Sequence, residues 1–555
     1  MPAGQLNFAG WQQLLAHYPD SDLTNAILGI CRFGARIGYE ESRGPIRIFP
    51  NLSSADESPV TVTADITTEL NQKRITCYTD IRHLPEHFTA SPLGLTDKSD
   101  GSKRRIHHLS YSENEENSIN GGIPEEYGRI TYSSVEDAIL AIQMFGPCCF
   151  LLKRDFENAF RHIPIAPDDA PLLGFHGQNK YYTEQFLPFG LRTAPYLFNL
   201  FAETFHWILA SDLQKNNLPA VVVHYLDDFL IIHPGEENPE TYSERFHHLA
   251  GRVGLSIKAS KSEQGTLVSF AGLELDTEQM VLRLPGSKLA KARTIVKTAT
   301  EADSLTLLEL QKITGYLNFV VMVTPLGRAF LRRLYNMQLF FPPRSRHHYQ
   351  RRISREAHKD LNWWHKLLEL GPERSIQKAE RETIYLWTDA AGSKGLGAFY
   401  TYSQLAKPGE KSSGAAPAGR TRPHPLPGMA FSINLPRHLR RTREHINTKE
   451  MRAVEQALLY WGQAWRRKRI VMHIDNRAVA YAIENRTIRG ESMNVLRRCL
   501  LLASEYDLEI DSKWIPTNDN TLADALSRFD FDRVANIAPQ LIYPTFSLRD
   551  HGFLT

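Results

Sequence analysis

Two groups of acidic residues stand where apolar segments of this chain begin or end. In the first group, Asp227 and Asp228 belong to the tetrapeptide YLDD, between the apolar runs VVVH and FLII. Two β-rich runs around a short polar tip predict a hairpin with both aspartates at its turn. Neighbouring carboxylates flanked by apolar residues repel each other and lose hydration, which a divalent cation would compensate. An ordinary β-turn containing aspartates is the alternative interpretation.

A third aspartate favours the metal interpretation. Asp155 follows the strand-like run CCFLLKR and precedes the helix-compatible NAF. If the two apolar runs form neighbouring strands, Asp155 faces Asp227 and Asp228. Such a cluster of hard oxygen ligands suits two Mg²⁺ ions about 4 Å apart, which can activate a hydroxyl group and stabilise a pyrophosphate leaving group. Asp168 and Asp169 follow in a turn that contains proline, and we expect them to be solvated.

The second group lies in the C-terminal part of the chain. Asp389 ends the run YLWTD, Glu450 lies in an amphipathic helical pattern, Asp475 ends the run IVMHID, and Asp524 belongs to TLADALSR. Carboxylates that converge from separate elements of a rigid scaffold are what two-metal hydrolysis of a phosphodiester requires.

Two nearby acidic residues compete with this second group. Glu455 lies on the same expected helix as Glu450 and offers the same chemistry. Asp519 lies close to Asp524, but its surroundings are typical of a turn. The loop before Asp524 reads IPTNDNTLAD and contains no histidine.

The elements that must position these residues change along the chain. Between about 91 and 275, short β-rich runs alternate with helical patterns, which predicts an α+β domain. Residues from about 285 to 375 have apolar positions near helical spacing, and an α/β pattern follows to about 530. The first 90 residues and those after Arg528 show no pattern that we can assign to chemistry.

Composition excludes several classes of protein. The 555 residues are 42% hydrophobic and 23% charged, which fits a soluble chain of two to four globular domains. We find no apolar run long enough to span a bilayer and no signal peptide, and the five cysteines form no zinc or disulfide pattern. An intracellular, reducing location is expected. The net charge of +3 is modest, but basic residues cluster at Ser102–Arg105 and Arg344–Arg355, where the alternative is a solvated face.

Three motifs in order, DFENAF, LPFGLRTAP and YLDD, resemble the successive palm motifs of reverse transcriptases. The resemblance implies that Asp155, Asp227 and Asp228 are catalytic metal ligands, Asp228 being the less certain direct ligand. SPLGLTDKSDGSKRRIHHLS resembles the fingers segment that holds the incoming triphosphate, although His108 stands where many relatives carry Asp, and GLSIKASKSE resembles a further motif near the triphosphate. The implied nucleotide-binding residues are Arg104, Lys103, Phe160, Phe189, Gly190 and Lys261, with Lys98 as a looser candidate.

Phe160 gives a sharper inference within this resemblance. It occupies the position beneath the sugar of the incoming nucleotide, where a bulky ring would clash with a 2′-hydroxyl group. The resemblance therefore predicts the use of deoxynucleotides. A core aromatic on a helix is the alternative interpretation. Gly190 would let the backbone approach the substrate, although LPFGLRTAP alone also fits a plain turn.

The acidic set Asp389, Glu450, Asp475 and Asp524 resembles the catalytic set of ribonuclease H, in the contexts TDA, HIDN and ADALSR. Further segments, including SINGGIP, ITYSSVEDAI and LQKITGYLNFVV, are most similar to the reverse transcriptase–ribonuclease H of DIRS-type (tyrosine-recombinase) retrotransposons. LTR-type elements are the nearest alternative.

The resemblance implies an α+β multidomain fold: a polymerase right hand (fingers, palm and thumb) with an antiparallel palm sheet, a helical connection, and an α/β ribonuclease H-like domain with a mixed sheet. The expected divisions are 1–90 of unassigned role, 91–280 fingers and palm, 281–375 thumb and connection, 376–530 ribonuclease H-like, and 531–555 a C-terminal tail.

The implied function is RNA- and DNA-directed DNA synthesis with cleavage of the RNA strand of hybrids. The implied cofactor is Mg²⁺, two ions per site, with Mn²⁺ as an alternative. The expected partners are an RNA template, a DNA primer, an RNA–DNA hybrid and deoxynucleoside triphosphates, with no membrane. A domesticated copy that binds nucleic acid without catalysis is the rival function, and an RNA-dependent RNA polymerase is disfavoured by Phe160.

Overall fold

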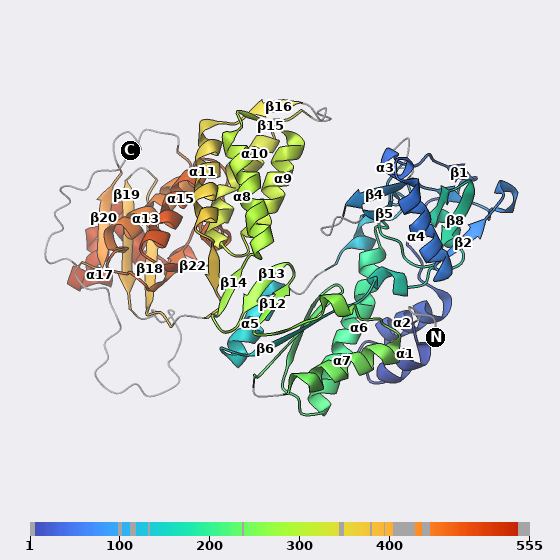
Figure 1. The fold of residues 1–555 in the computed structure, drawn as a ribbon. Coiled ribbons are helices and arrows are strands. Elements are labelled where there is room, and N and C mark those ends of the chain that lie inside the picture. The colour runs from blue at the N-terminus through green and yellow to red at the C-terminus, as the bar shows by residue number, and fades with distance from the viewer. Residues whose placement is uncertain are drawn as a thin grey trace. The chain divides into compact units, whose positions relative to one another are not determined.

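The computed structural model divides the chain into two compact units. The first unit comprises residues 1–285 and 375–377, and the second comprises 286–374 and 378–555. The residues that the structure describes are 6–97, 103–111, 118–130, 134–235, 238–342, 349–377, 380–392, 394–402, 428–435 and 444–541. Several sheets with helices packed on them (Figure 1) agree with the expected mixed α/β architecture. Within the described residues, no helix is long and apolar enough to cross a membrane.

One end of the first unit is a five-stranded sheet built by segments far apart in the chain. Its order is β1 (Arg47–Ile48), β3 (Thr89–Ala90), β7 (Gly174–Gly177), β8 (Lys180–Glu184) and β2 (Ile75–Tyr78). Beside it lie the short helix α3 (Ser53–Asp56), the helix α4 (Pro59–Asn71) and an antiparallel hairpin of β4 (Leu93–Asp97) and β5 (Lys103–His107). Ile66, Leu93, Phe175 and Tyr182 are buried together in this part.

The central sheet of the first unit is antiparallel. Its order is β11 (Glu263–Gly265), β6 (Phe150–Asp155), β10 (Asp228–His233) and β9 (Val221–Tyr225). The β-branched and aromatic runs VVV and FLII suit its buried strands. The helices of this part are α5 (Val135–Phe145), α6 (Ala194–Lys215) and α7 (Pro239–Val253). The next three strands along the chain, which pair antiparallel with one another in a separate sheet, are β12 (Leu267–Phe270), β13 (Leu273–Asp276) and β14 (Val281–Arg283).

The first 90 residues, to which no role could be assigned from sequence, belong to the first unit. The helices α1 (Phe8–Leu14) and α2 (Ser21–Phe33), with the C-cap residue of α1, contribute Trp11, Ile27 and Leu15 to the same core as α6 and α7. Trp11 packs edge-on against Phe201 of α6, with ring centroids 5.3 Å apart. The N-terminal segment therefore supplies part of the hydrophobic interior that supports the central sheet.

The second unit begins with the helical segment that the apolar spacing predicted. Its helices are α8 (Gly286–Glu301), α9 (Leu307–Val320), α10 (Arg332–Gln338) and α11 (Arg355–Glu369), with the short strands β15 (Ser304–Thr306), β16 (Gln350–Arg352) and β17 (Glu373–Ser375), the last at the boundary of the unit. The 3₁₀ turn Pro325–Phe330 lies between α9 and α10. Gly327 in this turn is packed so closely against Trp364 of α11 that a Cβ atom there would overlap the indole ring.

A mixed five-stranded sheet forms the rest of the second unit. Its order is β20 (Ala430–Asn434), β19 (Gly395–Thr401), β18 (Thr383–Ala390), β21 (Arg469–Ile474) and β22 (Glu509–Trp514). The first three strands pair antiparallel, whereas β18, β21 and β22 pair parallel. The helices are α13 (Ile446–Trp461), α14 (Arg477–Asn485), α15 (Ser492–Glu505), α16 (Thr521–Arg528) and α17 (Phe531–Ile537).

A buried ion network joins the helical segment to α15 within the second unit. Asp360 of α11 accepts from Arg333 at 3.0 Å and from Arg497 of α15 at 2.5 Å. The side chains of Asp360 and Arg497 are only 2% and 5% exposed. Arg497 also donates to the carbonyl of Ala329 at 2.9 Å. Because an uncompensated buried charge is very costly, removal of one partner should weaken this junction strongly.

We predict that Asp360→Ala lowers the free energy of unfolding of the second unit by about 3–5 kcal/mol, because Arg497 is left buried without its counter-charge. Urea unfolding of the full chain measures this loss. Glu356→Ala is the matched control, since Glu356 lies on the same helix and also contacts Arg333 but is half-exposed; its loss should stay below about 1 kcal/mol. Equal losses in the two variants would contradict the buried-network account.

Candidate active sites

Strand pairing brings the first group of aspartates together. In the antiparallel register of β6 and β10, Asp155 lies directly opposite Asp228. The predicted hairpin is confirmed, but its turn consists of Leu226 and Asp227, and Asp228 already begins β10. Leu226 has a φ of +53°, a backbone conformation that a leucine rarely adopts and that is typical of tight, functionally constrained turns. The backbone N–H of Phe156 donates to the carbonyl of Asp227 at 3.2 Å and fixes the turn beside β6.

Aromatic packing beneath this register holds the two strands in place. Phe156 and Phe229, the residues that follow Asp155 and Asp228, have ring centroids 5.3 Å apart. Both rings also contact Phe205 of α6 and Phe246 of α7. The site is therefore built on rigid elements, which keep the three carboxylate side chains in a defined geometry.

Two lysines provide positive charge next to these aspartates. Lys261 Nζ lies 2.8 Å from Asp155 Oδ2, and Lys153 Nζ lies 3.7 Å from Asp228 Oδ1. Lys153 also pairs with Glu263 at 3.4 Å. Both ammonium groups compensate carboxylates whose own hydration is reduced by burial. Asp155 is only 2% exposed.

The electrostatics of this cluster fit a bound divalent cation. Burial raises the pKa of Asp227, and the neighbouring Asp155 raises it further. Burial also raises the pKa of Asp228, which Lys153 opposes. Asp228 Oδ1 is buried and accepts no hydrogen bond from any described residue. Carboxylates with raised pKa values and an unsatisfied oxygen are hard ligands that Mg²⁺ would stabilise.

Three of the residues predicted to bind nucleotide, Arg104, Phe189 and Phe160, contact one another in series. The guanidinium of Arg104 lies 4.9 Å from the ring centroid of Phe189, a cation–π distance. The ring of Phe189 lies 5.3 Å from that of Phe160, which is half-buried against Phe198 of α6. Phe160 thus lies at the edge of the core, where its ring contacts Phe189, the residue that also contacts Arg104.

The loop that carries Phe189 is held by backbone constraints. Gly190 has a φ of +107°, and a Cβ atom there would overlap the carbonyl oxygen of His107 in β5. The buried Asn120 donates to the Gly190 carbonyl at 2.8 Å and accepts from the backbone N–H of Arg192 at 2.8 Å. Glycine is therefore required at 190 both for the conformation and for the close approach to β5.

Other candidates of the first unit have less specific positions. Lys103 donates to Ser58 Oγ at 3.0 Å, and His108 is exposed beside Tyr111. Lys98 lies outside the described residues. The expectation of two solvated turn aspartates holds for Asp168 but is wrong for Asp169, which is 1% exposed and accepts from the backbone N–H of Ile37 at 3.0 Å. Its buried position is a structural one, because two arginines neutralise it.

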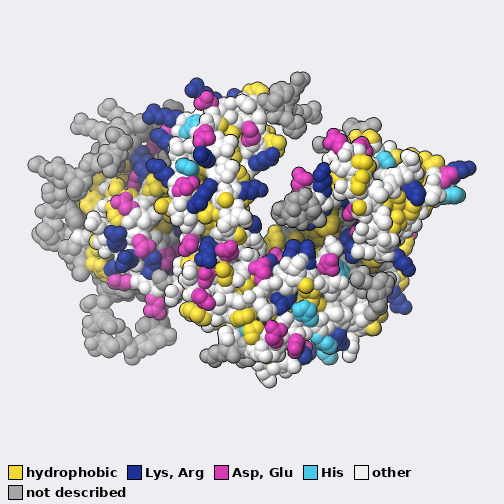
Figure 2. Space-filling model, viewed as in Figure 1, with side chains coloured by type: hydrophobic (Ala, Val, Ile, Leu, Met, Phe, Trp, Pro, Cys, Tyr) yellow, Lys and Arg dark blue, Asp and Glu magenta, His cyan; other side chains and the backbone are white. Residues whose placement is uncertain are grey.

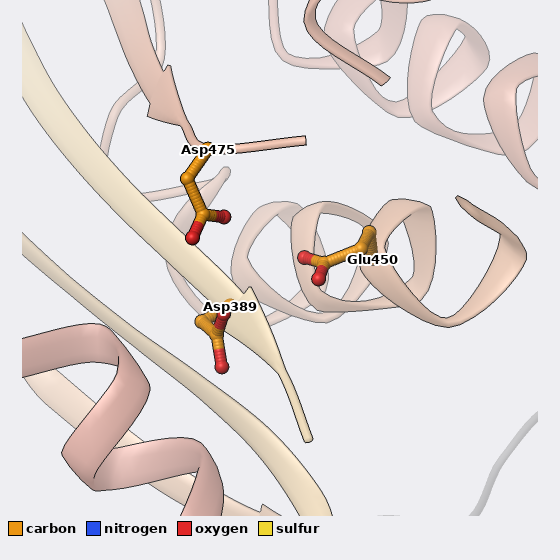
Figure 3. Close-up of side chains that lie close together, drawn as sticks. All are labelled: Asp389, Glu450 and Asp475. Atoms are coloured by element: carbon orange, nitrogen blue, oxygen red, sulfur yellow. The ribbon is translucent and has the colours of Figure 1, made fainter. Parts of the chain in front are cut away.

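Three of the four acidic residues in the second group converge. One carboxylate oxygen from each of Asp389, Glu450 and Asp475 lies within 4.8 Å of the others. Figure 3 shows the three side chains entering one space from strand β18, from helix α13 and from the end of β21. Because β18 and β21 are parallel neighbours, with Thr388 opposite Ile474, their carboxyl ends deliver Asp389 and Asp475 to the same edge of the sheet.

Burial and mutual repulsion also mark this second cluster. The pKa of Asp389 is raised to about 6. Burial is the main cause of this shift, a hydrogen bond from Ser527 opposes it, and the charges of Asp475 and Asp524 add to it. Burial, followed by repulsion from Asp389, raises the pKa of Glu450 well above its usual range. Glu450 Oε2 is buried and has no hydrogen-bond partner among the described residues. This donor set fits Mg²⁺ or Mn²⁺.

Asp524, the fourth predicted ligand, is not in the 4.8 Å group. It lies on α16 and is engaged by Arg528 Nε at 2.6 Å and by Arg533 Nη1 at 2.7 Å. Glu455, the alternative to Glu450, pairs with Arg498 instead. Glu455 follows Glu450 by five positions and so points to a different side of α13.

Four residues with direct contacts to the sites were missed by reasoning from sequence: Lys153, Asn120, Ser527 and Arg533. A lysine inside the apolar run CCFLLKRD was a usable signal for Lys153, since buried lysines are rare unless paired. Nothing in the local sequence marks Arg533, because its contact depends on how α17 packs against α16.

The predicted basic clusters are only partly described. Arg104 is exposed, whereas Arg105 pairs with Asp65 and Glu184. Of the run 344–355, residues 349–355 are described, and the strand β16 within it is exposed. On the face drawn in Figure 2, Lys and Arg side chains are interspersed with Asp and Glu. A nucleic-acid-binding role for these clusters stays a prediction.

The comparison with known families agrees with the position of the first site. Residues 122–295 match the family model described as reverse transcriptase (RNA-dependent DNA polymerase). This segment contains β6, β9 and β10 with their three aspartates. The chain carries a reverse transcriptase domain of the kind found in retroelement and retroviral polymerases. The second group of acidic residues lies outside this reverse transcriptase match.

Two viral proteins share sequence with part of this chain. Protein P of heron hepatitis B virus is 26% identical over 184 residues, which is 33% of this chain and 22% of the viral protein. The Gag-Pro-Pol polyprotein of human T-cell leukemia virus 2 is 25% identical over 190 residues, or 33% of this chain and 12% of that polyprotein. The matched region thus spans about a fifth or less of these relatives.

A solved structure of the foamy viral protease-reverse transcriptase dRH in complex with double-stranded DNA aligns with 91% of this chain and 81% of its own. The identity is 15% and the TM-score is 0.49.

We predict that Asp389→Asn stabilises the metal-free protein at pH 7.5 by roughly 1–3 kcal/mol and has little effect at pH 4. The pKa of Asp389 is raised to about 6 in the folded chain, so the folded state binds this proton more tightly than the unfolded state does. The destabilisation of the folded state by ionised Asp389 therefore grows as pH rises from about 4 to about 6 and stays constant above pH 6.

Urea unfolding in EDTA at both pH values measures this difference. Asp519→Asn, at an exposed position on the 3₁₀ turn Thr517–Asp519, is the control and should be neutral at both. A gain at pH 4 as large as that at pH 7.5 would show that the effect does not come from ionisation of Asp389.

Proposed function

We propose that this protein is an RNA- and DNA-directed DNA polymerase with a linked nuclease that cleaves the RNA strand of RNA–DNA hybrids. One observation carries the proposal: within the reverse transcriptase domain, Asp155 and Asp228 lie opposite each other on paired strands, with Asp227 in the adjoining turn. In this reading the first unit supplies fingers and palm, helices α8–α11 supply thumb and connection, and the mixed sheet of the second unit is the ribonuclease H-like domain.

The polymerase step needs a primer 3′-hydroxyl placed in line with the α-phosphate of the incoming nucleotide. Asp155 and Asp227 would hold Mg²⁺, with Asp228 beside them, and the bound ions would lower the pKa of the primer hydroxyl and stabilise the pyrophosphate leaving group. Lys261, whose Nζ lies 2.8 Å from Asp155 Oδ2, is within reach of the same region and would neutralise triphosphate oxygens.

Arg104 and the two aromatic residues beside it would select the nucleotide. The exposed Arg104 guanidinium is held over Phe189, so its remaining N–H groups can bind a triphosphate. The half-buried ring of Phe160 packs against Phe189 and Phe198 and cannot retreat into the core. A rigid ring beneath the sugar would exclude a 2′-hydroxyl group and favour deoxynucleotides.

The second cluster would cleave RNA. Asp389, Glu450 and Asp475 would hold divalent ions at one edge of the mixed sheet, with Asp524 as a fourth ligand from α16. Burial raises the pKa values of Asp389 and Glu450, so each anion is less stable there than in water, and a bound divalent cation would favour the anionic form of both. Hydrolysis of a phosphodiester by two-metal catalysis is the chemistry that such a set supports.

The substrates would be an RNA template with a DNA primer, the hybrid that they form, and deoxynucleoside triphosphates. The sequence similarity to DIRS-type retrotransposons stays a prediction about the source element. The neighbouring reading frame tests it: a tyrosine recombinase would support the prediction, and an integrase would assign the protein to LTR-type elements instead.

We predict that Asp227→Asn abolishes primer extension but spares RNA cleavage, and that Asp389→Asn does the reverse. Each substitution removes a carboxylate from only one cluster, so activity at that site should fall at least about 100-fold. The measurement is extension of a DNA primer on an end-labelled RNA template with deoxynucleotides and Mg²⁺, following both strands.

Glu240→Gln, on the solvent-exposed first turn of α7, and Asp519→Asn are the matched controls for the two units. Loss of both activities in either single variant would argue against two independent sites. Folded wild-type protein that binds the hybrid but neither extends nor cleaves would instead support a domesticated nucleic-acid-binding protein.

We predict that Phe160→Ala increases the use of ribonucleotides relative to deoxynucleotides by about 10- to 200-fold, because removal of the ring opens space for a 2′-hydroxyl group. The ratio of kcat/KM values for UTP and dTTP on one template measures the change. Phe198→Leu, which alters the core contact of Phe160 but leaves its ring present, is the control. An unchanged ratio in Phe160→Ala would assign the ring to the core alone.

A further inference from the structure

Helix α17 lies beyond the expected end of the nuclease domain, yet it belongs to that domain's interior. Val534, Ala538 and Leu541 are 2%, 0% and 5% exposed and pack with residues of α16 and the mixed sheet. Asp530 caps α17 by accepting from the backbone N–H of Arg533 at 3.1 Å. The position of Arg533 is therefore fixed by the core and by the helix cap.

Arg533 uses this fixed position to contact the predicted fourth ligand. Its Nη1 lies 2.7 Å from Asp524 Oδ2, while Arg528 Nε lies 2.6 Å from Asp524 Oδ1. Each oxygen of this carboxylate thus has its own guanidinium donor. The Asp524 side chain is 12% exposed, whereas those of Arg528 and Arg533 are 52% and 41% exposed.

The negative charge of Asp524 is neutralised by arginines, unlike the charges of Glu450 and Asp389. Glu450 Oε2 has no donor among the described residues, and burial, with repulsion from neighbouring carboxylates, raises the pKa values of Glu450 and Asp389. Asp524, in contrast, is held by two charge-assisted hydrogen bonds and stays outside the 4.8 Å carboxylate group. A carboxylate engaged in this way must give up at least one guanidinium before it can bind a cation.

We propose that Arg528 and Arg533 form an arginine clamp on Asp524 that opens when a divalent cation binds, so that residues 531–541 set the metal affinity of the nuclease site. The inference rests on the proposed function, since it assumes that the second cluster binds metal. Arg533 acts through Asp524 and is a positioning residue. The half-exposed guanidinium groups, once released, remain beside the site and are available to the phosphates of the substrate strand.

The test measures Mn²⁺ binding to the full chain by isothermal titration calorimetry, without substrate. Asp155→Asn, Asp227→Asn and Asp228→Asn are combined as the background, so that the remaining binding reports the second cluster. In this background Arg533→Gln, which keeps the side-chain length but removes the charge, should bind Mn²⁺ roughly threefold to tenfold more tightly, the range for one partly exposed charge-assisted pair. Arg528→Gln should shift the affinity in the same direction.

A double-mutant cycle separates the clamp from a general field effect. With Asp524→Asn in place, Arg533→Gln should no longer change the affinity, because the clamped carboxylate is absent. Arg477→Gln is the matched control: Arg477 packs on Trp514, whose Nε1 donates to the Asp475 carbonyl, so a charge is lost near the cluster without touching Asp524. The Mn²⁺ affinity of the Arg477→Gln variant should stay within about twofold of that of the background protein.

The outcomes are distinct. Unchanged or weaker Mn²⁺ binding in Arg533→Gln, or a gain that persists with Asp524→Asn, overturns the clamp. Absence of Mn²⁺ binding in the background protein itself overturns the proposed nuclease site and the clamp with it, whereas binding that Asp389→Asn abolishes and Arg533→Gln does not tighten overturns the clamp alone. Thermal unfolding of each variant shows whether α17 remains packed.

Discussion

The electrostatic cost of crowding carboxylates away from water is the constraint on which both candidate sites depend. Asp155 and Asp228 lie opposite each other on β6 and β10, and Asp389, Glu450 and Asp475 converge within 4.8 Å. Left to themselves, these groups would separate or take up protons. They stay together because packed strands and helices hold their backbones, as the contact between Phe156 and Phe229 does beneath the first site.

The two units compensate this repulsion in different ways. In the first unit, Lys261 and Lys153 supply positive charge directly to the aspartates. In the second, the arginines contact Asp524, and the core of the cluster has raised pKa values. In both units, burial raises the pKa values of clustered carboxyl groups, among them Asp228 in the first unit and Asp389 in the second.

Segments distant in sequence complete both units. Helices α1 and α2 share the core beneath the central sheet, and α17 closes the core beside the mixed sheet. The buried pair of Asp360 and Arg497 ties the helical segment to α15 within the second unit. The mixed sheet is thus packed against segments that precede it and follow it in the chain.

Much of this could be read from the sequence, because it is encoded locally. The runs VVVH and FLII around YLDD predicted the hairpin by β propensity alone, and the acidic residues at strand ends marked both clusters. The separation of Asp524 from its cluster, the burial of Asp169 and the contact of Arg533 with Asp524 were decided by the tertiary structure. Hydrogen-bond partners such as Arg533 and Asp524 meet only when α16 and α17 pack together. The amino-acid sequence by itself therefore determined which residues could do chemistry. The packing of the elements determined which charged groups face one another and which partner neutralises each of them.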